Sequence, residues 1–299
     1  MPSQNLSTVV DRRRRRTNAE IADMRETMLA ILRSDHPQSV RHVFYRMTDP
    51  RLSCAVEKSE RGYRHVQYQL SEMRKAGALP YGWIVDATRT GYFVDTFDSA
   101  TDFIERVSGL YRADLWKNSD VYLEVWVESR SIAGVIKSIC TEYCVPLYPA
   151  GGFASLTLSY EAATYINDQV DGTDRDIHVI YVGDYDPAGV LIDRDIENKL
   201  RSHLDCDNSL EFHRIAINPD QIRELDLPTK PRKEGDKRSL HVKETVEAEA
   251  MPAGMLRQLL REEIEYFIPQ NAILATRVAE QSEREFLQRM AAYSKGAAR

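Results

Sequence analysis

Three carboxylates in this chain are placed where they could bind one metal ion together. Glu128 follows one apolar stretch, and Asp184 and Asp186 follow another, within Gly183-Asp-Tyr-Asp-Pro-Ala-Gly189. In open parallel sheets functional groups collect at the carboxyl ends of the strands, so neighbouring strands would bring these acids to one edge. An oxygen-only ligand set suits Mg²⁺. The alternative interpretation is that Asp186 caps a helix and that the other two acids are simply solvated.

A tyrosine in the first part of the chain is a candidate nucleophile. Arg41 and Tyr45 are four residues apart, and on a helix they share one face. A phenol has a pKa of about 10, so its attack on a phosphodiester needs nearby positive charge and an oriented phosphate. A guanidinium can provide both through paired donors. The alternative is that Phe44 and Tyr45 are one core residue and one partly exposed neighbour.

The elements around Tyr45 predict a small α+β domain over residues 18–98. Helical spacing indicates helices from Asn18 to about Arg33, from Ser39 through Met47, and from Arg61 to Ala76. The stretch from Ala78 to Val94 is typical of a β-hairpin around a Thr-Arg-Thr-Gly turn. Three helices followed by a hairpin is the order of a winged helix-turn-helix, in which the third helix reads a DNA groove.

Basic side chains in this domain are the candidate DNA contacts. The third helix is expected to turn Val66, Leu70 and Met73 inward and its basic residues outward. Arg89 in the hairpin could contact phosphate or pair with Asp86. The predicted DNA-binding residues are Arg46, Arg64, Arg74, Lys75 and Arg89.

The second part of the chain, residues 118–299, predicts an α/β domain, reached through a helical connector over residues 99–117. The stretch from Ile177 to Val182 has almost no polar residue, which is typical of a parallel strand covered on both faces. Strands are expected at Val121–Val127, Val145–Tyr148, Ile177–Val182 and Leu210–Ile217, and helices at Ser131–Tyr143, Ser155–Gln169, Ala188–Leu204, Ala253–Ile268 and Ala272–Tyr293.

These motifs resemble a known family. A strand ending in Glu128 and a later one ending in Asp-x-Asp is similar to the Toprim domain of topoisomerases and primases. The continuation Asp186-Pro-Ala-Gly189 resembles the A subunit of type IIB topoisomerases (topoisomerase VI) and the related meiotic double-strand-break transesterase. In that family a winged-helix domain precedes Toprim and carries its tyrosine in Arg-x-x-(Phe/Tyr)-Tyr, which Arg41-His-Val-Phe-Tyr45 matches. Two further segments look like family motifs, Gly151-Gly-Phe-Ala-Ser155 and Val246-Glu-Ala-Glu-Ala-Met251.

The resemblance, which covers roughly residues 38–268, implies Mg²⁺-dependent cleavage of double-stranded DNA through a 5′-phosphotyrosyl link. Tyr45 would be the nucleophile and Arg41 its electrostatic partner, with Glu128, Asp184 and Asp186 as metal ligands. The family acts as a homodimer in which the Toprim domain of one chain serves the tyrosine of the other. Two alternatives stay open: a hydrolytic Toprim nuclease without tyrosine chemistry, and a winged-helix DNA-binding protein without catalysis.

Composition limits the partners that the chain could have. The net charge is −6, but residues 1–94 carry +6 and residues 95–299 carry −12, so a basic module that suits DNA precedes an acidic one. Residues 1–17 form a basic arm with five consecutive arginines, Arg12 to Arg16, that either contacts DNA or is a solvated tail. The sequence lacks a phosphate-binding loop of the Gly-x-x-x-x-Gly-Lys type, so ATP-driven strand passage would need a separate ATPase (B-type) subunit.

Location follows from what the sequence lacks. It has no apolar stretch near the roughly 20 residues that span a bilayer, and no apolar secretory segment near its start. Its four cysteines are too few and too unevenly spaced for a disulfide framework. We therefore expect no membrane association, and a cytoplasmic, nucleoid-associated protein with reduced thiols.

Overall fold

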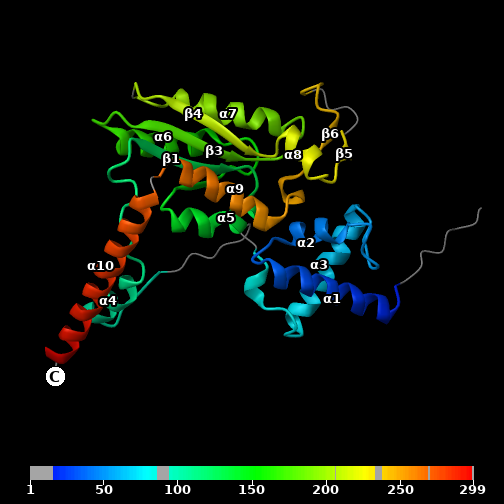
Figure 1. Cartoon of the computed structure of the whole chain (residues 1–299), viewed down its shortest axis with the longest axis horizontal. Coiled ribbons are helices and arrows are strands. Elements are labelled where there is room, and N and C mark those ends of the chain that lie inside the picture. The colour runs from blue at the N-terminus through cyan, green and yellow to red at the C-terminus, as the bar shows by residue number, and fades with distance from the viewer. Residues whose placement is uncertain (1–15, 86–93, 206, 233–237, 269, 298–299) are drawn as a thin grey trace, which may run out of the picture.

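The computed structural model describes residues 16–85, 94–205, 207–232, 238–268 and 270–297, so Arg89 and most of the basic arm lie outside it. A helical N-terminal region is followed by an α/β domain built on a four-stranded parallel sheet (Figure 1). The predicted α/β class is confirmed.

The N-terminal region begins with the three predicted helices, α1 (Asn18–Ser34), α2 (Val40–Met47) and α3 (Glu60–Lys75). A hydroxyl side chain caps the amino end of each helix: Thr17, Ser39 and Ser59 accept hydrogen bonds from backbone N–H groups of the first turn. The inward residues predicted on α3 are buried, as expected.

The segment after α3 differs from the expected hairpin. Residues 78–85 contain a 3₁₀ turn, η1 (Tyr81–Trp83), and Ile84 forms a single bridge with Gln38 instead of the first hairpin strand. Arg74 explains the turn, because its Nη2 donates to the carbonyl oxygens of Tyr81 and Ile84 at 2.6 and 3.2 Å. The rest of the expected hairpin lies outside the described residues.

The sheet contains the four predicted strands in the order β2-β1-β3-β4, all parallel. Their bounds are β1 (Val121–Val127), β2 (Leu147–Pro149), β3 (Asp176–Val182) and β4 (Leu210–Ala216). Val127 lies opposite Val182 in the central pair, so β1 and β3 end side by side. The helices that connect successive strands are α5 (Arg130–Glu142), α6 (Leu156–Val170) and α7 (Gly189–Arg201).

Helices cover both faces of the sheet, which makes a three-layer domain (Figure 1). One apolar core contains Trp126 and Tyr181 beneath α6 and α7. The other lies beneath α5 and α9 (Ala253–Tyr266), and it continues into the N-terminal helices through Met28 and Val43. The N-terminal region is therefore packed against the sheet domain by a shared core, and α2 contacts η2 (Ala248–Ala250).

The remaining elements extend this frame. The connector forms α4 (Ala100–Ser108), which lies along the C-terminal helix α10 (Gln270–Ala297) at one end of the molecule (Figure 1). A short helix, α8 (Pro219–Glu224), and a hairpin of β5 (Lys230–Pro231) and β6 (Glu244–Thr245) were not predicted. Among the residues described here, no helix is both long and apolar enough to cross a membrane.

Candidate functional site

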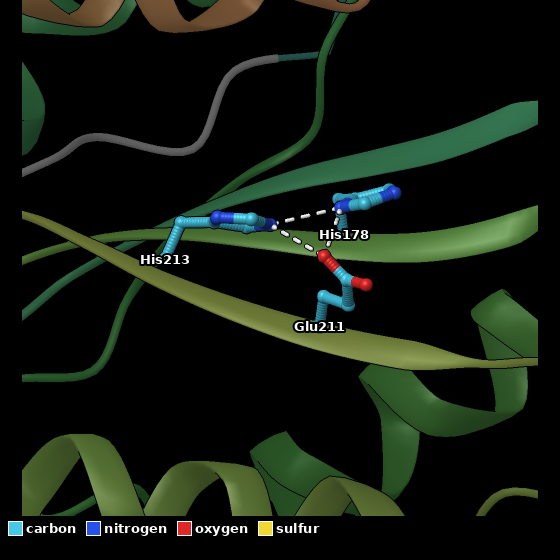
Figure 2. Close-up of side chains that lie close together, drawn as sticks. All are labelled: His178, Glu211 and His213. Carbon is cyan, nitrogen blue, oxygen red and sulfur yellow. Dashed lines mark hydrogen bonds and ion pairs between the residues drawn. The ribbon is translucent and has the colours of Figure 1, made fainter.

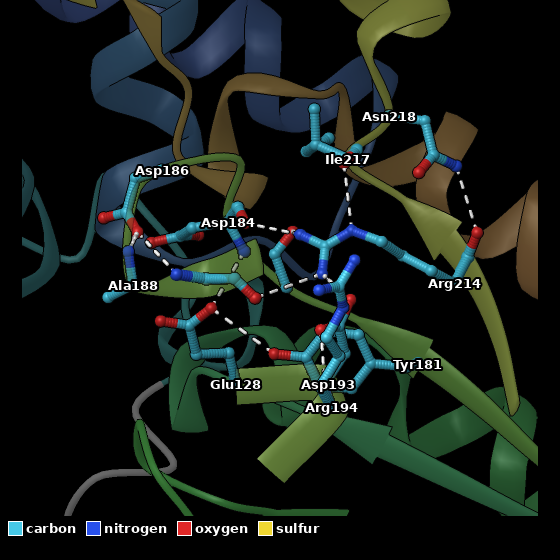
Figure 3. A network of polar contacts seen from close by, with 12 residues as sticks. Glu128, Tyr181, Asp184, Asp186, Ala188, Asp193, Arg194, Arg214, Ile217 and Asn218 are labelled. Atoms are coloured by element: carbon cyan, nitrogen blue, oxygen red, sulfur yellow. Dashed lines mark hydrogen bonds and ion pairs between the residues drawn. The ribbon is translucent and has the colours of Figure 1, made fainter. Parts of the chain in front are cut away.

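Glu128 and Asp184 meet at the carboxyl edge of the sheet because β1 and β3 are adjacent and in register. The backbone N–H of Asp184 donates to Glu128 Oε2 at 3.0 Å (Figure 3). The turn after β2 fixes the backbone of Glu128, since Gly151 and Gly152 both donate to its carbonyl oxygen, at 2.8 and 3.1 Å. Their φ angles of +72° and +103° favour glycine at both positions. Glu128 and Asp184 therefore lie side by side at the carboxyl ends of β1 and β3.

Asp184 and Asp186 both line the pocket at this edge, but their oxygens have different partners. Asp184 Oδ1 accepts from the N–H of Ala248 at 2.8 Å. Asp186 Oδ1 accepts from the N–H groups of Ala188 and Gly189 at 2.8 and 2.6 Å, and so caps the start of α7 (Figure 3). The capping role considered for Asp186 is therefore real, and it coexists with a position in the pocket.

A fourth carboxylate, Glu249, joins the predicted three. It is 5 % exposed, and it accepts hydrogen bonds from the hydroxyls of Ser131 and Ser129, the latter at 3.1 Å. Sequence reasoning did not name it as a site residue. The available signal was the acidic-apolar segment of residues 246–251, which forms η2 and reaches the edge of the sheet from a distant part of the chain.

Crowding of these acids changes their proton affinity. The pKa of Glu128 is raised to about 6 by burial and by the charges of Asp186 and Glu249, although the Asp184 N–H and Arg214 act in the opposite direction. The pKa of Asp184 is raised well above its usual range by burial and by the charges of Glu128 and Glu249. Carboxylates held this close repel one another unless protons or a cation neutralise them. Hard divalent cations prefer such oxygen donors, but no three of these acids bring their oxygens within 4.8 Å of one another, so their side chains would have to turn inward to share one ion.

Positive side chains face the same pocket, which encloses about 550 Å³. Arg41 pairs with Glu247, and Lys230 Nζ lies 2.8 Å from the other carboxylate oxygen of Glu247. The Arg41 side chain is still 42 % exposed, so it can also reach a ligand. The residues that give the pocket its mixed charge are Arg41, Arg130, Lys230, Arg238, Asp184, Asp186, Glu247 and Glu249. Acids beside cations are the surroundings that a metal-bound phosphate needs.

Tyr45 lies next to this pocket, with 5 % of its surface exposed. It belongs to the buried apolar core, but two cations also lie beside its ring: the Nζ atoms of Lys58 and Lys230 are 5.6 and 5.7 Å from the ring centroid. Burial, and the charge and hydrogen bonding of Glu247, raise the pKa of the phenol, so it is protonated at neutral pH. Because Arg41 and Tyr45 share one face of α2, both reach Glu247.

The predicted DNA contacts are mostly engaged within the N-terminal region. Arg64 pairs with Glu60 at 3.1 Å, and Lys75 pairs with Glu72 at 2.8 Å, each along α3. Arg74 is turned onto backbone carbonyls, as described above, while Arg46 is exposed on α2. Exposed intrahelical pairs contribute little to stability, so Arg64 and Lys75 can exchange their partners for phosphate at small cost.

Comparison with known proteins gives no relative: no family model, curated protein or solved structure matches this chain.

Proposed function

We propose that this chain cleaves DNA at the acidic pocket by tyrosine transesterification, with a winged-helix module and a Toprim module related to the A subunit of type IIB topoisomerases. The arrangement around Glu247 carries the proposal. That carboxylate contacts Arg41 and Lys230 and lies close enough to Tyr45 to raise the pKa of the phenol, while its neighbours in the chain reach the acids at the sheet edge through Ala248 N–H and Glu249. One short segment thus links a candidate nucleophile, phosphate-binding cations and a candidate metal site.

We propose Mg²⁺ as the ion of the acids at the sheet edge, whose side chains would turn inward to share it. Glu128, Asp184, Asp186 and Glu249 would hold it, because they offer oxygen donors and because their mutual repulsion is relieved by a cation. When bound, Mg²⁺ supplies charge stabilisation to phosphate oxygens and to the departing 3′ oxygen.

The chain's own residues account for the nucleophilic step. Tyr45 Oη forms a bond to phosphorus while the bond from phosphorus to the 3′ oxygen breaks. Although burial acts in the opposite direction, Lys230 and Arg41 lower the pKa of Glu247 while they pair with it, so the phenolic proton passes to Glu247 once these cations have moved onto the phosphate. The 3′ oxygen takes a proton from water, which leaves a 5′-phosphotyrosyl link and a free 3′ hydroxyl. Arg41 and Lys230 hold the non-bridging oxygens. Each chain carries one such tyrosine, so a double-strand break requires a homodimer, and strand passage requires a separate ATPase subunit.

The low exposure of Tyr45 favours a second candidate function. A phenol that is only 5 % exposed has little room to approach a DNA backbone without movement of its neighbours. In a hydrolytic nuclease water would attack phosphorus instead, the bond to the 3′ oxygen would break, and the 5′ end would keep a free phosphate. Tyr45 would then position Glu247.

DNA cleavage assays separate the two candidates. Purified chain, supercoiled plasmid and Mg²⁺ are incubated, stopped with detergent, and examined for protein attached to 5′ ends. We expect nicked or linear DNA with attached protein, complete loss of attachment in Tyr45→Phe, and loss of all cleavage in Asp184→Asn. Glu247→Gln should slow attachment by about 10²-fold or more, the usual contribution of a proton acceptor.

Tyr160→Phe is the matched control, because Tyr160 is 57 % exposed on α6 of the sheet domain and has no part in the proposed chemistry or DNA contacts. It should cleave like the unmodified chain. If Tyr45→Phe produces free 5′ phosphates as fast as the unmodified chain does, the mechanism is hydrolysis and not transesterification. A wild-type chain that cuts neither supercoiled nor linear DNA would refute both candidates.

A further inference from the structure

Two histidines and a glutamate meet on one face of the sheet, apart from the acidic pocket. His178 lies in β3, and Glu211 and His213 lie in the edge strand β4 (Figure 2). Because successive side chains of a strand alternate between faces, Glu211 and His213 point the same way. Glu211 is the register partner of His178, so all three side chains converge on the face covered by α9.

The three side chains present ligand atoms at distances that suit one ion. His178 Nδ1 is 2.9 Å from His213 Nε2, and Glu211 Oε2 is 3.7 and 3.6 Å from these two nitrogens. A tetrahedral Zn²⁺ ion with bonds of about 2.0–2.1 Å separates its ligand atoms by about 3.3 Å. One of the three observed distances is shorter than this separation and two are longer, so small side-chain shifts would bring the ligand atoms to the spacing that zinc requires.

We propose that His178, Glu211 and His213 form a binding site for a transition-metal ion, Zn²⁺, with His178 Nδ1, His213 Nε2 and a Glu211 carboxylate oxygen as its ligands. Two imidazoles and one carboxylate form a set that zinc accepts, with water in the fourth position. The Glu211 side chain is 58 % exposed, which leaves a solvent path to the ion, whereas His178 is only 8 % exposed.

The surroundings of the trio hold its rings in place. Glu263 Oε1 on α9 lies 3.9 Å from Nδ1 of His213, the ring nitrogen that faces away from the site. A carboxylate on that side favours the tautomer with a proton on Nδ1, which leaves the Nε2 lone pair for a metal. The ring of Phe267 packs against His178 with 4.5 Å between centroids and closes the apolar side.

This site is separate from the acidic pocket in position and in chemistry. His178 is six residues before Asp184 along an extended strand, which corresponds to about 20 Å. The pocket at the sheet edge offers carboxylate oxygens, which suit Mg²⁺, whereas imidazole nitrogens suit zinc and other transition metals. Zinc at the trio would tie the edge strand β4 to β3, and it would stabilise the folded chain because the unfolded chain lacks the preformed site.

Titration of the metal-free full chain tests the proposal. After dialysis against a chelator, Zn²⁺ is added in the presence of excess Mg²⁺, which occupies the acidic pocket, and binding is followed by calorimetry. Co²⁺ replaces Zn²⁺ in a parallel titration that records visible absorption. We expect one ion per chain with the intense bands of tetrahedral Co²⁺. Affinity should fall by about 100-fold or more in His178→Ala and His213→Ala, and by about 10- to 100-fold in Glu263→Gln.

Matched variants keep the result independent of folding and of the proposed DNA chemistry. His241→Ala removes an exposed imidazole elsewhere, and Asp184→Asn alters the acidic pocket; both should bind zinc like the unmodified chain. Circular dichroism of each metal-free variant verifies its fold, and zinc should raise the melting temperature of the unmodified chain but not that of His213→Ala. Absence of zinc binding, or binding unchanged in both histidine variants, would overturn the site.

Discussion

At the scale of single residues, Glu124 is the most unusual acid in the sheet. It lies in the middle of β1 with no exposed surface, and its carboxylate accepts hydrogen bonds from Tyr122 Oη and Trp126 Nε1, both at 2.8 Å. Burial raises the pKa of Glu124 to about 7, although the hydrogen bonds to its charged form act in the opposite direction. A buried carboxyl of this kind makes stability depend on pH.

We expect Glu124→Gln to remove part of the pH dependence of unfolding. The folded state binds a proton at Glu124 that the unfolded state has lost between pH 4.5 and 7, so this group's contribution to the unfolding free energy rises as pH falls through 7. The shift corresponds to about 3 kcal/mol. As the pH rises from 5 to 8, the unfolding free energy of Glu124→Gln should therefore increase relative to that of the unmodified chain. An amide can still accept from Trp126 and donate to Tyr122.

Urea unfolding at several pH values measures this difference directly. Glu161→Gln on α6 is the control, because Glu161 is exposed. The comparison between variants cancels the pH dependence of other groups, such as His42, whose pKa is lowered to about 3 by burial and by the charge of Arg257. A difference between Glu124→Gln and the unmodified chain that stays constant from pH 5 to pH 8 would contradict a raised pKa.

Some residues of the candidate site could be predicted from the sequence, and others could not. Glu128 and Asp184 could be placed at one edge because each follows an apolar strand and parallel strands end together. Glu247 and Glu249 could not be placed there by spacing, since their position depends on how a distant segment packs. His178 was missed for the same reason: its partners lie on another strand, and the register between β3 and β4 is not visible in the sequence.

At the scale of elements, the junction between β3 and α7 is tightly packed. A Cβ atom on Gly189 would lie 2.2 Å from the carbonyl oxygen of Asp184, which is far inside van der Waals contact. The N–H of Gly189 also binds Asp186. Gly189→Ala should therefore displace the backbone that carries both acids, lower the unfolding free energy by about 1–3 kcal/mol, and weaken Mg²⁺ binding.

Urea unfolding and Mg²⁺ calorimetry check this expectation. Gly109→Ala is the matched control: Gly109 follows α4 with a φ of −71°, and a Cβ there meets nothing within 4 Å. The control should change neither quantity. A Gly189→Ala chain with the stability and Mg²⁺ affinity of the unmodified chain would show that this junction does not position the acids.

Most long elements could be predicted from periodicity, and the short ones could not. The strand β1 and the helix α1 follow clear apolar patterns, and their bounds agree with the sequence within a residue or so. The 3₁₀ turn at Tyr81–Trp83 replaced an expected strand because Arg74 binds its carbonyls, a tertiary contact that overrides local β-propensity. The β5 and β6 strands have two residues each, too few for any period.

At the scale of the whole molecule, the tyrosine and the acids of one candidate site could come from the same chain or from two chains of a dimer. The family resemblance implied that the tyrosine of one chain serves the acids of another. In this structure the N-terminal helices share an apolar core with the sheet domain, and Tyr45 reaches Glu247 of its own chain. The same Glu247 lies in the segment whose Ala248 N–H binds Asp184. We therefore expect each chain of a homodimer to use its own tyrosine and its own acids.

Mixed dimers distinguish the two arrangements. Tyr45→Phe and Asp184→Asn chains are each inactive under the proposed mechanism, and co-expression with two different affinity tags allows the mixed species to be purified. If a site combined the tyrosine of one chain with the acids of the other, the mixed dimer would regain one intact site and would nick supercoiled DNA with attached protein. If each chain completes its own site, every site in the mixed dimer has one defect. We expect no nicking, whereas a mixed dimer of unmodified and Tyr45→Phe chains should nick one strand.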